Sequence, residues 1–408
     1  MRDFHNLMGR AGRAGLHTEG SIIFSNTEIY DLKEKNDYHW RKTLKLLNPN
    51  NTEPCNSNLI RLFDPYKLPE NNIYPFDLKE FIELYFYYEE NLVEKIVSKI
   101  SYRENDSVDL KREIKKLENQ IENKVVIFRS LESFLLANMD YFSDNLNNES
   151  VEKFVHETLA YSQASINEKT LLLNLFNQIS GHLSIIEENK QKRQCYGKTF
   201  LGVRECQNIE SWILNEKQLI LNSNTFEKLS NTLSRIIIEK SIPQKVLNKN
   251  NFNSFKSLYY AWLEGCPYHI IHQEVKKVNF GTLKKQRSPK IDDVIDICEN
   301  NLSYKGSLLI GAILDIIALY PEFTPDNIHL LKIFQKCLKY GLPSEKHVLV
   351  HEIGFVDRVI CQEIVDSLSN VPMTKEEIIS YISKNKEIFG EIIDKYPSYY
   401  YKVLDSFF

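Results

Sequence analysis

Residues 110–128 read LKREIKKLENQIENKVVIF, and this stretch decides the fold class. Its apolar residues recur at steps of three, four and seven, at Leu110, Ile114, Leu117, Ile121 and Phe128. Charged and amide side chains fill most positions between them, which is typical of a long amphipathic helix with one buried face. The stretch therefore predicts a helix that packs against another helix and keeps its charges in solvent.

Helical patterns continue on both sides of this stretch. Only 14 Gly and 13 Pro occur among the 408 residues, so few positions interrupt a helix. Three prolines fall within residues 61–76, which predicts an extended connector before a helix that opens near Leu78. The other predicted helical blocks cover residues 150–186, 207–240 and 291–318. The predicted fold class is mainly α.

Composition narrows the class of protein further. Apolar residues make up 42% and charged residues 26% of the chain, which is typical of a globular protein and argues against a disordered or collagen-like one. The net charge of -4 means that any contact with nucleic acid must use a local basic face. The seven cysteines form no C-x-x-C pair, which favours reduced thiols and a cytoplasmic location.

Neither a membrane segment nor a metal site is expected. The most apolar stretch, residues 307–319, contains Asp315 and is shorter than the roughly 20 residues that span a bilayer. The histidine pairs His269/His272 and His347/His351 lack a third ligand at a usable spacing.

The first 25 residues carry the sharpest chemical pattern. Residues 8–15 read MGRAGRAG, with Arg10 and Arg13 one helical turn apart, so both could face a single anion. Gly9 and Gly12 would let the backbone approach that anion closely. On composition alone, a flexible Gly/Arg leader is an equal alternative.

The order of residues from Asn6 to Arg13, N-x-x-G-R-A-G-R, followed by an apolar strand at residues 21–24, resembles motif VI of superfamily 2 helicases. The likeness is to DEAD/DEAH-box helicases of the superkiller-like and bacterial-defence branches. This resemblance implies that Arg10 and Arg13 act as catalytic arginine fingers on the γ-phosphate of ATP. It also implies that Asn6, Gly9 and Gly12 belong to the nucleotide site, although the family has glutamine in place of Asn6.

The other parts of a helicase motor do not occur in this sequence. It has no phosphate loop G-x-x-x-x-G-K-[ST] and no Asp-Glu-x-His or Asp-Glu-x-Asp run. Its one Gly-Lys-Thr, residues 197–199, has Lys192 where the loop needs its first glycine, and is interpreted as a surface turn. The expected chain is a C-terminal helicase fragment that starts at motif VI. It would use ATP and Mg²⁺ only with the missing N-terminal motor domain, and would bind no cofactor and hydrolyse no ATP alone.

Two weaker resemblances lie in the C-terminal third. Residues 260–265, YAWLEG, resemble the W-x-x-G element of the helical region of these helicases. Residues 354–358, GFVDR, resemble a turn of the helix-hairpin-helix-like modules that close such chains.

In that family, a so-called ratchet helix contacts the translocating single strand, and residues 284–309 are the candidate here. The candidate nucleic-acid contacts are Lys284, Lys285, Arg287, Lys290 and Tyr304. The cations could pair with phosphates and the tyrosine could stack on a base. The alternative is a solvated loop before a core helix, with four apolar residues facing inward: Ile295, Leu302, Leu309 and Ile313.

Three parts are expected: a remnant of the second RecA-like lobe (1–30), a helical region with a winged helix and the long amphipathic helix (31–205), and a ratchet-like helical bundle (206–408). The expected function is the nucleic-acid-contacting C-terminal part of an ATP-dependent helicase. Its expected partners are single-stranded DNA or RNA, and the missing N-terminal lobes or a protein of an antiviral defence system. The alternative is a non-enzymatic helical interaction or scaffold protein in which GRAGRAG is coincidental.

Overall fold

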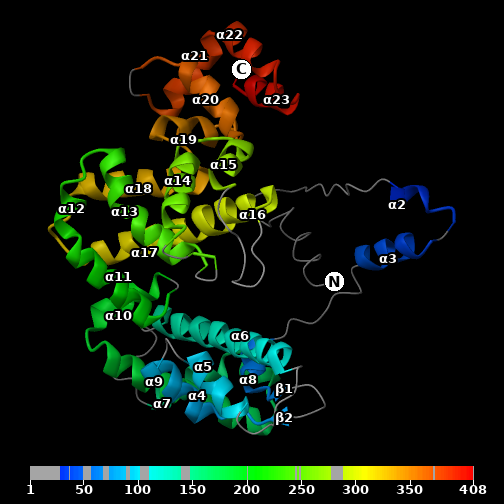
Figure 1. Cartoon of the computed structure of the whole chain (residues 1–408), viewed down its shortest axis with the longest axis vertical. Helices are drawn as coiled ribbons and strands as arrows, with labels where there is room; N and C mark the ends of the chain where they lie inside the picture. The colour runs from blue at the N-terminus through cyan, green and yellow to red at the C-terminus, as the bar shows by residue number, and fades with distance from the viewer. Residues whose placement is uncertain are drawn as a thin grey trace.

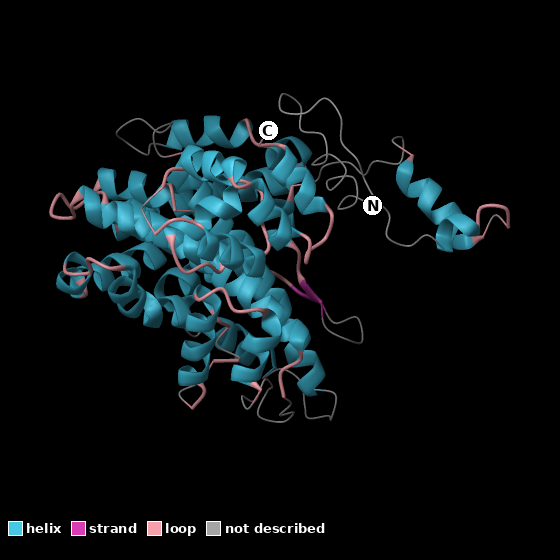
Figure 2. Cartoon of the chain, turned by 90° about the horizontal axis from the view of Figure 1, so that it is seen from above, coloured by secondary structure: helices cyan, strands magenta, loops and turns pink. Residues whose placement is uncertain are grey.

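The computed structural model describes residues 28–35, 37–48, 57–67, 73–88, 92–101, 110–138, 148–199, 201–243, 246–247, 250–276, 288–370 and 373–407. These ranges are almost entirely helical, as Figures 1 and 2 show, and the mainly α prediction is confirmed. The predicted RecA-like remnant lies outside the described residues except for its last three. The winged helix stays a prediction.

The helices described up to residue 200 are α2 (Glu28–Asp31), α3 (Tyr38–Leu47), the 3₁₀ turn η2 (Asn58–Phe63), α4 (Leu78–Tyr88), α5 (Leu92–Ser101), α6 (Leu110–Ala137), α7 (Asn148–His156), α8 (Leu159–Gln163), α9 (Ile166–Ile186) and α10 (Lys190–Gly197). Of these, α2 and α3 contact each other and stand apart from the rest in Figure 1. The long helix α6 contacts η2, α5 and α10.

The second half of the chain continues in helices. They are α11 (Val203–Asn215), α12 (Lys217–Leu221), α13 (Phe226–Ser241), α14 (Phe252–Leu263), α15 (Tyr268–Val275), α16 (Ile291–Asp296), the π-helix η5 (Ile297–Gly306), α17 (Ser307–Ile317), α18 (Pro325–Tyr340), α19 (Glu345–Glu352), α20 (Arg358–Ser367), α21 (Lys375–Lys384), α22 (Lys386–Ile393) and α23 (Tyr399–Asp405). In Figure 1 the helices α19–α23 form a cap at one end of the molecule.

The helix predicted from residues 110–128 is confirmed as α6, which extends to Ala137. Its apolar face is buried: Ile121 and Phe128 are both 0% exposed. The Phe128 ring lies 5.6 Å from the ring of Phe81 and 4.4 Å from that of Tyr85, both on α4. Aromatic rings at these separations attract each other, which stabilises the packing beyond the burial of apolar area.

The connector predicted over residues 61–76 contains a short hairpin, visible at the edge of the helices in Figure 2. Its strands, β1 (Tyr66–Lys67) and β2 (Ile73–Tyr74), pair antiparallel with Tyr66 opposite Tyr74. Helix α6 holds the hairpin, because the Gln120 amide bonds both the N–H and the C=O of Lys67 at 2.8 Å.

The interpretation of residues 197–199 as a surface turn is wrong in its burial. Gly197 is the last residue of α10 and is buried, and Thr199 is 4% exposed. A Cβ at Gly197 would lie 2.4 Å from the carbonyl oxygen of Leu136. Glycine is therefore needed where α10 crosses α6, and the spacing alone gave no sign of that crossing.

The boundary expected after residue 205 falls inside α11, so a helix and not a linker joins the two parts. Helix α11 contacts α6, α10 and α17. The six cysteines in the described ranges are free thiols. Across those same ranges, every helix is too short or too polar to cross a lipid bilayer.

Candidate functional site

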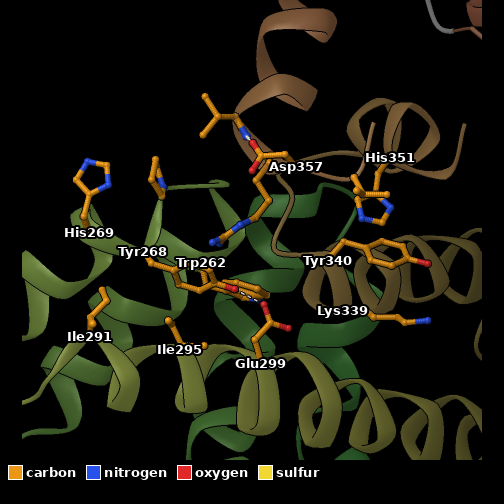
Figure 3. A pocket seen from close by; sticks show the side chains of 14 residues that line it. Trp262, Tyr268, His269, Ile291, Ile295, Glu299, Lys339, Tyr340, His351 and Asp357 are labelled. Atoms are coloured by element: carbon orange, nitrogen blue, oxygen red, sulfur yellow. Dashed lines mark hydrogen bonds between the residues drawn. The ribbon is translucent and has the colours of Figure 1, made fainter. Parts of the chain in front are cut away.

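A pocket of about 610 Å³ lies where α14, α15 and α16 meet the C-terminal end of α18 and the cap helices α19 and α20 (Figure 3). Its volume lies within the range of small-molecule sites. Aromatic, cationic and acidic side chains share its wall: Trp262, Tyr268, His269, Glu299, Lys339, Tyr340, His351, Asp357 and Arg358.

Trp262 forms the buried floor of this pocket. Its ring is 1% exposed, and its indole N–H donates to the carbonyl oxygen of Leu338 at 2.7 Å. The hydrogen bond satisfies a polar group that burial would otherwise leave unpaired. It also anchors α14 to the last turn of α18.

Gly341 makes this close packing possible. It ends α18 in the left-handed conformation, with φ +64°, which glycine adopts at little cost. A Cβ on this residue would lie 2.7 Å from the Trp262 ring. The helix end and the position of the tryptophan therefore both depend on the missing side chain.

Arg358 is the first residue of α20, and its side chain extends onto the Trp262 ring. Asp357 caps that helix, since its carboxylate accepts from the N–H of Val359 at 2.8 Å and of Ile360 at 3.3 Å. The guanidinium carbon of Arg358 lies 4.3 Å from the ring centre of Trp262 and 4.3 Å from that of Tyr268. These are cation–π distances.

The guanidinium of Arg358 has no acceptor among the residues that the structure describes. Its Nη1 is buried without a hydrogen-bond partner, and within the described ranges no carboxylate pairs with the group. A buried hydrogen-bond donor without an acceptor costs about 1–3 kcal/mol. The pocket thus holds a cation that forms no hydrogen bond to any of the described residues.

Tyr268 links this cation to a carboxylate. Its hydroxyl donates to Oε1 of Glu299, drawn as a dashed line in Figure 3. Burial, together with this hydrogen bond, raises the pKa of Tyr268, so the hydroxyl stays protonated as a donor. The second oxygen of Glu299 has no partner among the described residues. A carboxylate can accept several hydrogen bonds, so Glu299 has capacity left for a ligand.

A second aromatic pair closes the other side of the pocket. The rings of Tyr340 and His351 stack with centres 4.1 Å apart and an angle of 26°. Burial lowers the pKa of His351, and the charge of Lys339 lowers it further against the opposing effect of Glu352. The imidazole is therefore neutral at pH 7, and the Lys339 ammonium, 5.1 Å from the Tyr340 ring centre, supplies positive charge instead.

Most of the residues predicted for a site lie outside the described ranges: Asn6, Gly9, Arg10, Gly12, Arg13, Lys284, Lys285 and Arg287. The two that are described lie on one continuous helix formed by α16, η5 and α17. Lys290 is exposed at the start of α16, directly before the pocket residue Ile291. Tyr304 is 65% exposed on η5, so its ring is available for stacking.

The alternative reading of this helix as a core helix is only partly confirmed. Leu302, Leu309 and Ile313 are buried, as expected. The expectation for Ile295 is wrong, because it is 37% exposed and lines the pocket. Ile295 and Glu299 are four residues apart and share the face that looks toward Trp262 in Figure 3.

The candidate residues chosen from the sequence did not include Tyr268, Glu299, Tyr340 or His351. Trp262 and Arg358 did fall within the two weaker resemblances, which were the only indication in the sequence that these residues belong to a site. The structure brings these two segments together, although they lie far apart in the chain. The aromatic and acidic neighbours could be found only once the helices were packed.

No protein-family model matches this chain, and no curated protein matches it at a significant level. In the described ranges, no group of three or more His, Cys, Asp or Glu side chains is placed to hold a metal ion.

Proposed function

We propose that this chain is the C-terminal, nucleic-acid-contacting part of an ATP-dependent helicase, and that the pocket around Arg358 contacts a single strand of DNA or RNA. The observation that carries the proposal is the meeting of Trp262 and Arg358. Trp262 belongs to a segment that resembles the helical region of these helicases, and Arg358 to one that resembles their closing helix-hairpin-helix-like modules; both residues line the same pocket. A cytoplasmic location is part of the proposal.

The chemistry of the wall suits a single strand. Aromatic side chains can stack on unpaired bases, at about 1–3 kcal/mol for each base. Arg358 and Lys339 can pair with backbone phosphates, and Lys290 lies at the start of the helix that forms the pocket's lower wall. The exposed ring of Tyr304 lies farther along that helix.

In this proposal Arg10 and Arg13 act on ATP held by other helicase lobes, with Asn6, Gly9 and Gly12 shaping their turn. ATP and Mg²⁺ would then bind only when those lobes are present. The resemblance of residues 6–24 to motif VI supports this part of the proposal.

The test is fluorescence anisotropy of the full chain with labelled dT and rU single strands at rising salt. We expect the affinity to fall steeply with salt. Arg358→Met should weaken binding at every salt concentration. The triple variant Lys284→Ala/Lys285→Ala/Arg287→Ala should also lower the salt slope, by about 1 for each lost phosphate contact.

Two variants control for the loss of positive charge elsewhere on the surface. Arg235 is 79% exposed on α13 and pairs with Glu239, so Arg235→Gln removes one positive charge away from the pocket. Lys115→Ala/Lys116→Ala removes two exposed charges from α6. Both should bind like the parent chain. If these controls weaken binding as much as the pocket variants do, the proposed site is refuted.

The alternative is a non-enzymatic interaction or scaffold protein. The observation that favours it is a second, apolar pocket of about 360 Å³ between η2, α6 and α8, whose wall includes Leu59, Val126, Phe134 and Leu159. Absence of single-strand binding at low salt would favour this alternative over the helicase proposal.

A further inference from the structure

Arg358 and Glu299 face the same pocket and yet do not pair with each other. The Arg358 guanidinium packs on the Tyr268 ring, while the Tyr268 hydroxyl bonds Oε1 of Glu299. The tyrosine thus contacts both charged groups. Among the described residues, the Arg358 guanidinium has no acceptor and the second oxygen of Glu299 has no donor, and both groups line one cavity.

A ligand that satisfies both groups must present acceptors on one edge and donors on the next. Among the bases of a single strand, guanine does this most completely. Its N7 and O6 accept both hydrogen bonds of an arginine fork. Its N1–H and exocyclic amino group can both donate to a carboxylate. Cytosine and adenine each offer a single donor group, and thymine and uracil offer no paired acceptors on the arginine side.

The surroundings fit a planar base. Tyr268 and Tyr340 lie to either side of Glu299 in Figure 3, and both rings are only partly buried. The cavity of about 610 Å³ is large enough for one nucleotide-sized group. The apolar edge formed by Ile291 and Ile295 lies on the same side as His269.

We propose that this pocket takes up one unstacked guanine base, with Arg358 on its N7/O6 edge and Glu299 on its N1/N2 edge. The inference rests on the proposed function, since the base belongs to a bound single strand. It adds a preference for guanine to a surface that would otherwise bind any sequence. One bidentate pair of this kind discriminates by about 1–3 kcal/mol, so a preference of roughly 5- to 150-fold is expected.

The experiment compares a dT strand with the same strand carrying one central dG, in the full chain at fixed salt. Two analogues dissect the preference. Inosine lacks the amino group that would reach Glu299, and 7-deazaguanine lacks the N7 that would reach Arg358. Each should lose most of the gain that dG brings.

Variants then test the two partners through the ratio of dG-strand to dT-strand affinity. Arg358→Lys keeps the charge but not the fork, and Glu299→Gln keeps the size but not the charge. Both should bring the ratio close to one, whereas Arg235→Gln should leave it unchanged. A second readout is the thermal stabilisation of the chain by GMP, which should exceed that by UMP and be lost in Glu299→Gln.

The outcomes separate the two proposals. If dT and dG strands bind equally, or if both pocket variants keep the full preference, the guanine site is refuted while single-strand binding stands. If neither strand binds at low salt but GMP still stabilises the chain, the pocket chemistry holds and the helicase proposal falls. If neither strand nor GMP binds, both fail.

Discussion

The guanidinium carbon of Arg358 lies 4.3 Å from the ring centre of Trp262, which places the first residue of α20 against the last turn of α14. This contact ties the cap helices α19–α23 to the helices that hold the pocket. A cation–π contact of this kind contributes about 0.5–2 kcal/mol. The buried Nη1 atom of Arg358 has no acceptor among the described residues, and leaving this donor unpaired destabilises the fold. The two effects are of similar size and opposite sign.

Replacing Arg358 with methionine should therefore change stability little. The apolar stem would still pack on the rings, while both the cation–π attraction and the unpaired donor would be removed. We expect the free energy of unfolding in urea to change by less than about 1 kcal/mol. Single-strand affinity should fall in the same samples. A loss of stability above about 2 kcal/mol would instead show that Arg358 has a structural role, and would contradict its assignment to the binding site.

The helices could be predicted because their signal is local. The period that places Ile121 and Phe128 on one face of α6 requires only neighbouring residues, and both are fully buried. Ile295 shows the limit of that reasoning. Its spacing is helical and its side chain apolar, yet it borders a pocket because none of the described helices covers it fully. Periodicity tells which residues share a face, but not what packs against it.

The pocket could not be predicted for the same reason. Trp262 stood out through a resemblance, but its partners come from α15, η5, α18 and α20. Their meeting depends on how the helices cross, and in particular on Gly341. In the sequence, that residue is an ordinary helix stop. Its second role, making room for the tryptophan ring, is a property of the packed structure.

Gly341→Ala should be strongly destabilising. Alanine is strained at φ +64°, and its Cβ would lie 2.7 Å from the Trp262 ring. We expect a loss of about 2–4 kcal/mol, from the backbone strain and the overpacking together. Thermal or urea unfolding measures this change.

Gly181→Ala is the matched control for that variant. Gly181 lies inside α9, and a Cβ there would meet nothing within 4 Å. Alanine should stabilise this helix by about 0.5–1 kcal/mol. Equal effects of the two substitutions would show that the conformation and the packing of Gly341 do not matter.

Glu210 should make stability depend on pH. This carboxylate is 6% exposed and accepts from Tyr196 at 2.7 Å, from Tyr320, and from Lys192 at 3.0 Å. Burial alone would raise its pKa, but the hydrogen bonds from Tyr320, Tyr196 and Lys192 outweigh that effect and lower it. A carboxylate whose pKa is lower in the folded state stabilises the fold above its ordinary pKa of 4.5, and this contribution is lost as the pH falls through the folded value.

The variant Glu210→Gln tests that dependence. Its amide group would present a donor to the donors around it, so we expect a loss of about 1–3 kcal/mol at pH 7. The difference from the parent chain should shrink as the pH is lowered below 4.5. Glu239→Gln, in the exposed pair with Arg235, should change stability by less than about 0.5 kcal/mol at either pH. A difference for Glu210→Gln that stays constant across the acid range would mean that the carboxylate charge contributes nothing.

Tyr304 provides a direct test of the strand path along the helix formed by α16 and η5. Its ring is 65% exposed, so removing it should leave the free energy of unfolding within about 0.5 kcal/mol of the parent chain. If a base stacks on this ring, Tyr304→Ala should weaken single-strand binding by about 1–3 kcal/mol, and Tyr304→Phe should restore most of it, because the phenyl ring keeps the stacking face. Tyr399 on α23 is 56% exposed and lies on the cap, so Tyr399→Ala is the matched control and should bind like the parent chain. If Tyr304→Ala binds with unchanged affinity, no base stacks on this helix beyond Glu299. The bound strand would then contact the Arg358 pocket without continuing to Tyr304.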